Sequence, residues 1–260
     1  MKALLQKKGF ICDMDGVIYH GDRLLPGVRE FVDWLYAEKK EFLFLTNNSS
    51  HNADFYVQRL KRMGLNVGRE KVLTSGEATA AVLKETYPNK RAFVLGNEFL
   101  LEEMREAGVM VDQTDPEIVV VGYDTTLDYK KMTAVCDLVR AGLPYIATHP
   151  DFNCPTETGF APDIGAIMAF IEASTGRRAD LVVGKPHTGI VQAALRRTGL
   201  QVGQMAMVGD RLYTDIETGL KSGMLSILVM SGETTPEMLA AYPNKPDLVF
   251  DRLAEMIPLL

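Results

Sequence analysis

The sequence is poor in cysteine, in basic runs and in long apolar stretches, and each shortage excludes a class of protein. Only three of its 260 residues are cysteines, and they are widely spaced, which argues against a disulfide scaffold or a zinc site and favours a reducing compartment. The net charge is −6 and the chain has no run of Lys and Arg, so a nucleic-acid polymer is not expected as a partner.

Membrane and export signals are also missing from the sequence. No stretch approaches the ~20 apolar residues of a membrane span, and residues 1–8 hold too few apolar side chains for a signal peptide. We therefore expect a cytoplasmic protein that does not bind membranes. Hydrophobic residues at 47% and charged residues at 24% are instead typical of a globular chain, long enough for one large domain or two smaller ones.

Short apolar runs alternate with amphipathic segments along the chain. The spacing of Val28, Phe31, Val32 and Leu35 predicts a helix with one buried face. The continuous apolar run 42–45 is typical of a strand buried on both faces of a parallel sheet. Similar runs predict strands at 10–12, 71–74, 91–95, 118–121, 145–147, 205–208, 225–229 and 248–250, with a small hairpin within 16–26. This alternation predicts an α/β fold with a Rossmann-like parallel sheet.

The polar residues that follow these runs are separated by a long insertion. From Thr46 to Lys185 the chain takes 139 residues, whereas one crossover between parallel strands needs only a few dozen. The excess predicts a second α/β lobe. We expect this lobe to span residues 82–180 and to be inserted into a first lobe formed by residues 1–81 and 181–260.

Polar residues of a few kinds stand at or just beyond the ends of the predicted strands. The ends of parallel strands line the ligand crevice of an open α/β sheet, so these side chains should converge. Four carboxylates cannot all ionise together without a cation, and hard oxygen ligands favour Mg²⁺. The carboxylates and their cation, together with one ammonium group and one hydroxyl, form a set of groups typical of a site that binds a phosphoryl group. The residues are Asp13, Asp15, Thr46, Lys185, Asp210 and Asp215.

Each acidic residue has an expected task. Asp13 is the candidate nucleophile towards phosphorus, and Asp15 is the candidate acid that protonates the leaving group and later activates water. Asp210 is expected to bind Mg²⁺ directly, as is the Asp13 carboxylate. Asp215 is expected to contact Mg²⁺-bound water or Lys185, a role compatible with a helix N-cap. Taken singly, Asp13 and Asp15 also fit ordinary turn residues.

The remaining residues are expected to hold the phosphoryl oxygens. Thr46 offers a hydroxyl donor, and Asn47 adds a backbone N–H beside it. Lys185 supplies a positive charge that stabilises the transferring phosphoryl group. The alternatives are a β-branched strand residue followed by a polar turn for Thr46, and a solvated surface lysine for Lys185.

The order of these segments resembles the haloacid dehalogenase (HAD) phosphohydrolase superfamily. Its DxDG, Thr, Lys and GDxxxxD motifs match Asp13 and Asp15, Thr46, Lys185, and Asp210 and Asp215. The resemblance implies an inserted α/β cap of type C2 and a Mg²⁺ that is also bound by the backbone carbonyl of Asp15. The insertion, with Thr148-His-Pro-Asp151 and Gly184-Lys-Pro, is similar to the NagD-like subfamily, also called subfamily IIA or the p-nitrophenylphosphatase family.

One cap segment departs from the pattern of that subfamily. The family usually has Thr-Asn where this chain has Thr148-His149. The resemblance places this segment near the leaving group of the substrate, so His149 and Asp151 are candidates for substrate specificity. An ordinary turn residue is the alternative for His149.

We therefore expect a Mg²⁺-dependent phosphatase that hydrolyses small phosphomonoesters, such as nucleotide, sugar or other metabolite phosphates, through an aspartyl phosphate. A phosphomutase or phosphonate hydrolase on the same fold is the alternative among enzymes. A phospho-receiver domain or a silent metabolite-binding protein is the alternative outside catalysis, although Asp210, Asp215 and the long insertion disfavour the receiver. Monomer and homodimer both remain open.

Overall fold

The computed structural model describes residues 2–156 and 158–259, which form two compact units. The first unit contains the residues up to Thr46, Asp54–Leu73 and the residues from Ala194 on, and the second contains Asn47–Ala53 and Thr74–Ala193. No helix in the described part of the chain is long and apolar enough to cross a membrane. The lobe boundaries expected from the sequence, at residues 82 and 180, stay a prediction.

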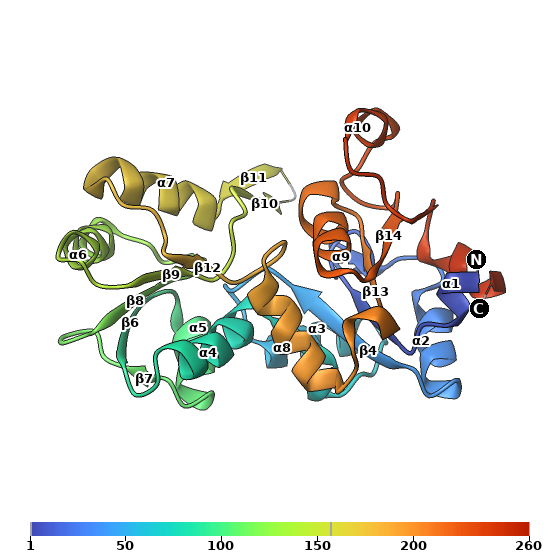
Figure 1. Ribbon diagram of the computed structural model, residues 1–260, viewed down its shortest axis with the longest axis horizontal. Coiled ribbons are helices and arrows are strands. Elements are labelled where there is room, and N and C mark those ends of the chain that lie inside the picture. Colours follow the sequence, from blue (N-terminus) through green and yellow to red (C-terminus); the bar gives the residue numbers. More distant parts are fainter. Residues whose placement is uncertain (1, 157, 260) are drawn as a thin grey trace. The chain divides into compact units, whose positions relative to one another are not determined.

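The first unit is built on a six-stranded sheet with the order β15-β14-β13-β1-β4-β5. Its strands come from both ends of the sequence and are drawn in blue and in orange to red in Figure 1. The central strand β1 pairs in parallel with β13 on one side and with β4 on the other. The predicted parallel Rossmann-like sheet is confirmed. The strands are β1 (Gly9–Cys12), β4 (Glu41–Thr46), β5 (Val72–Thr74), β13 (Met205–Gly209), β14 (Leu225–Val229) and β15 (Leu248–Phe250).

Helices follow most of these strands, as the sequence pattern predicts. Helix α2 (Val28–Ala37) buries Val28, Phe31, Val32 and Leu35, which are the residues that the helical spacing selects. The other helices that precede or follow strands of this sheet in the chain are α1 (Lys2–Leu5), α3 (Ala53–Arg62), α8 (Thr188–Thr198), α9 (Glu217–Ser222) and α10 (Pro236–Ala241). The segment Leu253–Leu259 forms a 3₁₀ helix.

A small hairpin follows β1 where the sequence predicts one. Strands β2 (Tyr19–His20) and β3 (Arg23–Leu24) pair antiparallel. Gly16 begins the turn with φ of +82°, a backbone conformation that glycine adopts without strain. The hairpin therefore places Asp15 at its base.

The second unit is built on a five-stranded parallel sheet with the order β12-β9-β8-β6-β7, whose strands run from green to gold in Figure 1. Helices α6 (Tyr129–Arg140) and α7 (Ile164–Thr175) pack on one face of this sheet, in a core that includes Phe93, Val119 and Tyr145. The strands are β6 (Arg91–Leu95), β7 (Met110–Val111), β8 (Ile118–Val121), β9 (Tyr145–Ala147) and β12 (Leu181–Val182), and the remaining helices are α4 (Ser75–Thr86) and α5 (Glu98–Glu106).

Two features of the second unit are not evident from the sequence pattern. Strands β10 (Asn153–Thr156) and β11 (Gly159–Pro162) form an antiparallel hairpin, although their prolines and glycine weaken any strand signal. Strand β12 pairs with β9, so the strand before Lys185 belongs to the five-stranded sheet and not to the six-stranded one.

Candidate active site

Two aspartates stand at the same edge of the six-stranded sheet. Asp13 follows β1 and Asp210 follows β13, and these neighbouring strands run parallel with Cys12 opposite Val208. The backbone N–H of Asp13 donates a 2.9 Å hydrogen bond to the carbonyl of Val208, so the pairing continues to the point where the carboxylates leave the sheet. The strand register therefore brings the two side chains together.

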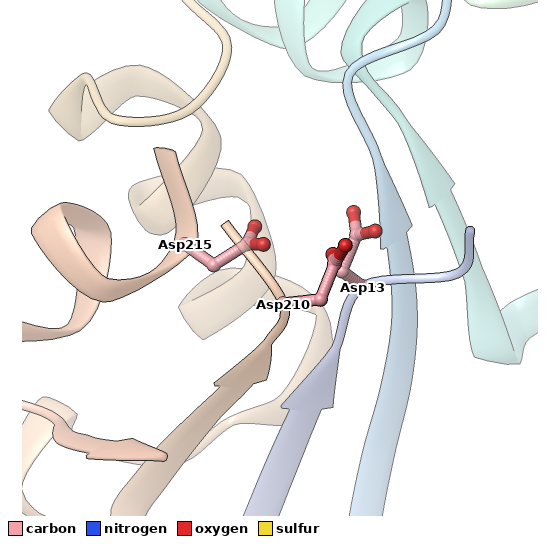
Figure 2. A group of neighbouring side chains, drawn as sticks. All are labelled: Asp13, Asp210 and Asp215. Atoms are coloured by element: carbon pink, nitrogen blue, oxygen red, sulfur yellow. The ribbon is translucent and has the colours of Figure 1, made fainter. Parts of the chain in front are cut away.

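A third carboxylate joins them from the segment that follows β13. Asp215 lies in a π-helical turn, Leu212–Ile216, and is fully buried. Figure 2 shows its side chain directed towards Asp13 and Asp210. One carboxylate oxygen from each of the three residues lies within 4.8 Å of the others, which is close enough for a single cation to contact all three.

The Asp210 carboxylate is enclosed by backbone. A Cβ atom added to Gly16 or Gly232 would lie 2.5 or 1.9 Å from its Oδ2, so both loops approach closely enough to require glycine. The backbone N–H of Glu233 donates to Oδ2 at 2.7 Å. The other oxygen, Oδ1, is buried and has no hydrogen-bond partner among residues 2–156 and 158–259.

The electrostatics of this cluster favour a cation. Burial raises the pKa of Asp210 well above its ordinary value, and the nearby charges of Asp13 and Asp215 raise it further. The hydrogen bond from Glu233 and the charge of Arg211 oppose these effects only in part. Three carboxylates and a bare buried oxygen, with no sulfur or imidazole in the set, fit a hard divalent ion such as Mg²⁺.

Asp15 lies outside the three-carboxylate cluster, at the base of the hairpin. Although its residue surface is exposed, desolvation by the surrounding protein raises the pKa of Asp15, while the charges of Arg59, Arg211 and His20 lower it. A carboxyl group with a raised pKa holds a proton more readily, as a general acid must. Asp15 therefore differs from the three clustered carboxylates both in its position and in its suitability as a proton donor.

Thr46 reaches the same edge of the first sheet from the other side of β1. It is the last residue of β4, which pairs in parallel with β1 so that Cys12 lies opposite Phe44. Only 9% of the residue is exposed. Asp210 and Asp13 therefore directly follow the adjacent strands β13 and β1, and Thr46 ends the next strand, β4.

The predicted residues of the second unit form a polar cluster of their own. Asn47 and Lys185 are both buried, and the Asn47 side chain hydrogen-bonds the backbone of Lys185 on both sides, at 2.8 Å to the N–H and 3.1 Å to the carbonyl. The same Nδ2 donates to the Asp151 carboxylate at 3.1 Å. The structure thus brings Asn47, Asp151 and Lys185 together.

His149 is the innermost member of this cluster. Its side chain is fully buried, with Nδ1 3.7 Å from Asp151 and Nε2 3.5 Å from Asp163. Asp163 is the N-cap of α7, where its Oδ1 accepts a 2.6 Å hydrogen bond from the N–H of Ile164. His149 therefore lies between two carboxylates, and any influence on a substrate has to pass through its neighbours. Its predicted role in specificity stays a prediction.

Comparison with known proteins identifies the family. A model described as haloacid dehalogenase-like hydrolase matches residues 10–110, and one described as HAD-hydrolase-like matches residues 182–256. The dihydroxyacetone phosphatase of Corynebacterium glutamicum is 33% identical over 247 residues, which cover 95% of this chain and 90% of that protein. This chain belongs to the haloacid dehalogenase superfamily. A second HAD relative, the 5'-nucleotidase YutF of Bacillus subtilis, is 32% identical over 97% of this chain and 98% of its own.

Solved structures narrow the position of the chain within the HAD superfamily. The 4-nitrophenylphosphatase of Thermotoga maritima superposes with a TM-score of 0.96 at 46% identity, covering 98% of both chains. NagD from E. coli K-12 superposes with a TM-score of 0.90 at 32% identity, covering 96% of this chain and 98% of that one. The predicted membership of the NagD-like, p-nitrophenylphosphatase subfamily is confirmed, as is the prediction of an HAD-type phosphatase.

The sequence does not single out three residues that contact predicted site residues within one unit or the other. Arg211 directly follows Asp210, and its Nε lies 2.9 Å from Glu233. Its position inside the fourth motif could have marked it as a site residue. Asp163 precedes an apolar helix, which is the signature of an N-cap, but nothing in the sequence links it to His149. Gly232 also gave no signal, because its contact with Asp210 joins distant parts of the chain.

Proposed function

We propose that this HAD phosphatase hydrolyses small phosphomonoesters through an aspartyl phosphate on Asp13. The observation that carries the proposal is the group of three carboxylates, Asp13, Asp210 and Asp215, with oxygens within 4.8 Å of one another. One of these carboxylates stands at the end of a central strand, where a nucleophile is accessible and rigidly held.

The reaction proceeds in two steps. In the first, a carboxylate oxygen of Asp13 forms a bond to phosphorus while the ester P–O bond breaks, and Asp15 gives its proton to the leaving oxygen. In the second, Asp15 takes a proton from water, which attacks phosphorus and breaks the bond to Asp13. Inorganic phosphate leaves, and both carboxyl groups return to their first states.

The Mg²⁺ that this chemistry requires would be held by Asp13, Asp210 and the backbone carbonyl of Asp15, with Asp215 binding it directly or through water. The bare Oδ1 of Asp210 and the raised pKa of that residue support this assignment. When bound, Mg²⁺ neutralises the acids and polarises the phosphoryl oxygens.

Phosphate binding and substrate recognition would be divided among the remaining residues. The hydroxyl of Thr46, the backbone N–H of Asn47 and the ammonium of Lys185 would hold the phosphoryl oxygens. Residues 82–180 would act as the cap that excludes water and reads the leaving group, with His149 and Asp151 influencing specificity.

The names of the relatives support a small, polar leaving group. One relative is named for dihydroxyacetone phosphate and another for 5'-nucleotides, so triose or sugar phosphates and nucleoside monophosphates are the first substrates to examine. Three free cysteines support a reducing, cytoplasmic location. For the assembly, monomer and homodimer both stay open.

The decisive experiment measures free phosphate released from a panel of phosphomonoesters, including p-nitrophenyl phosphate, by the purified protein. Release with Mg²⁺ and without any phosphoryl acceptor is expected, and EDTA should abolish it. Phosphate transfer that requires an acceptor would instead indicate a phosphomutase, and selective cleavage of phosphonates would indicate a phosphonate hydrolase. No turnover of any compound would indicate a binding protein.

A further inference from the structure

The side chain of Asn47 completes a hydrogen-bond ladder that the sheet leaves unfinished. The pairing between the β12 segment and the β9 segment continues past both strands, with Val183 N–H donating to Ala147 at 3.1 Å and Gly184 N–H donating to Thr148 at 2.8 Å. At Lys185 the backbone partner changes. Its N–H donates to Oδ1 of Asn47 at 2.8 Å, and its carbonyl accepts from Nδ2 at 3.1 Å.

This amide is itself fixed on several sides. Its Nδ2 also donates to Asp151, and the hydroxyl of Ser75 donates to the Asn47 backbone carbonyl. A Cβ atom added to Gly184 would lie 2.8 Å from Oδ1 of Asn47 and 2.6 Å from the Cβ of His149. The backbone before Lys185 therefore passes close to both side chains, and Asn47 has little room to turn.

The contact with Asn47 holds the backbone of Lys185. The next residue is Pro186, which has no N–H to add to the ladder. The two hydrogen bonds from Asn47 therefore hold the peptide groups on both sides of the Lys185 Cα, which fixes the root of a long flexible side chain. A charge acting on a transition state must be held within a fraction of an ångström.

We propose that the Asn47 side chain is a positioning residue for Lys185, distinct from the backbone N–H of Asn47 that we assign to phosphate binding. This inference rests on the proposed function, in which Lys185 binds the phosphoryl group. It predicts that Asn47 acts on the reaction through Lys185, so its side chain should have no effect once the lysine charge is absent.

A double-mutant cycle tests this dependence. Asn47→Leu keeps the backbone N–H and the approximate shape but removes the side-chain hydrogen bonds to Lys185 and Asp151, and Lys185→Met removes the ammonium. We expect Asn47→Leu alone to lower kcat/KM by up to about 10²-fold and to raise the inhibition constant for inorganic phosphate. In the Lys185→Met background the same change should alter kcat/KM by less than about twofold.

Asn97→Leu provides the matched control. Asn97 is equally buried in the second unit, caps α5 and donates side-chain hydrogen bonds to Ser50 and Thr125, but it does not touch Lys185 in the described part of the chain. Its loss should lower the melting temperature with little effect on phosphate inhibition. If Asn47→Leu does not fold, Asn47→Ser takes its place in the cycle.

The outcomes separate this inference from the proposed function. If the fold-losses in kcat/KM of Asn47→Leu and Lys185→Met multiply in the double variant, the two residues act independently, and the positioning role is overturned. The proposed phosphatase function of the wild-type protein would be unaffected by that result. An unchanged inhibition constant for phosphate in Asn47→Leu would overturn it as well. A wild-type protein without phosphatase activity would instead overturn the proposed function itself.

Discussion

The backbone N–H of Glu233 donates a 2.7 Å hydrogen bond to Oδ2 of Asp210. This contact holds one carboxylate oxygen and leaves the other, Oδ1, buried without a hydrogen bond from residues 2–156 or 158–259. Leaving a buried acceptor unsatisfied is costly, and the cost is larger beside two further carboxylates. A cation in contact with Oδ1 removes this cost, which makes metal binding a source of stability as well as of chemistry.

Mg²⁺ should therefore stabilise the folded protein. At a hundredfold excess over Kd, a ligand that binds only the folded state contributes about 2.7 kcal/mol. For a chain of this length, that corresponds to a rise in Tm of roughly 5–10 °C. Thermal melting of EDTA-treated protein with and without added Mg²⁺ measures the effect.

Asp210→Asn is the matched variant for this experiment. It keeps the size of the side chain and removes one of three neighbouring negative charges. We expect its metal-free form to melt at or above the temperature of the metal-free wild type, because burial and like charge disfavour the ionised Asp210. A response to Mg²⁺ equal to that of the wild type would contradict the assignment of Asp210 as a ligand.

Asp13→Asn should abolish turnover, because an amide is too weak a nucleophile to attack phosphorus. No phosphate labile to alkali or hydroxylamine, as an acyl phosphate is, should remain on this variant after it is mixed with substrate and quenched in acid. The assay is rapid quench with ³²P-labelled substrate followed by mass determination of the protein. Turnover at the wild-type rate would show that Asp13 is not the nucleophile.

Asp15→Asn should slow both steps without removing the nucleophile. General acid–base catalysis contributes about 10²–10⁴-fold, and we expect a loss in kcat of that size. The loss in kcat/KM, which reports formation of the aspartyl phosphate, should be smaller for p-nitrophenyl phosphate than for a sugar phosphate, because p-nitrophenolate leaves without a proton. Equal losses for the two substrates would argue against proton donation by Asp15 in the first step.

His149→Asn should change the ranking of phosphomonoesters by kcat/KM while the Mg²⁺ requirement persists. The imidazole lies between Asp151 and Asp163, so its loss should shift Asp151 and the surface that this residue presents. Val139→Ala, which opens a cavity in the hydrophobic core of the second unit, serves as a control for loss of stability. A lower Tm with an unchanged ranking, as expected for Val139→Ala, would make His149 a purely structural residue.

Glu117 should contribute to stability in a pH-dependent way. A hydrogen bond from the Lys90 ammonium, another from the Arg91 N–H and the charges of both residues hold its pKa below the ordinary value of 4.5. A depressed pKa in the folded state stabilises the protein above the unfolded pKa, and this contribution disappears as pH falls through the folded value. Glu117→Gln should therefore be less stable than wild type at pH 7 and nearly equal once the pH falls below the folded-state pKa of Glu117, as measured by urea unfolding across the acid range. The same stability difference at both pH values would contradict this linkage.

The sequence predicts most of the framework because the signals are local. The apolar run 42–45 and the spacing of Val28, Phe31, Val32 and Leu35 define a strand and a helix within one window of residues. In a parallel sheet the strand ends meet at one edge, so the positions of Asp13, Thr46 and Asp210 after predicted strands are enough to expect that they lie together.

Pairings between distant segments are less accessible from the sequence. The hairpin of β10 and β11 was missed because Pro155, Gly159 and Pro162 are poor strand residues, and only their pairing makes them strands. Strand β12 has two residues, too few for its own pattern to show which sheet it joins. Helix α10 was also missed, although Thr235 and Pro236 are typical of a helix start.

Chemistry and periodicity are properties of short segments, so the alternating α/β order, the set of acidic, hydroxyl and ammonium groups, and their positions after strands can all be derived from the sequence. Three relationships are visible only in the folded molecule: Asp215 turns towards Asp13 and Asp210, the side chain of Asp15 lies outside their cluster, and Asn47 holds the backbone of Lys185. These relationships depend on side-chain direction and on contacts between residues far apart in the sequence, such as Asn47 and Lys185, 138 positions apart, which packing selects and local sequence does not encode.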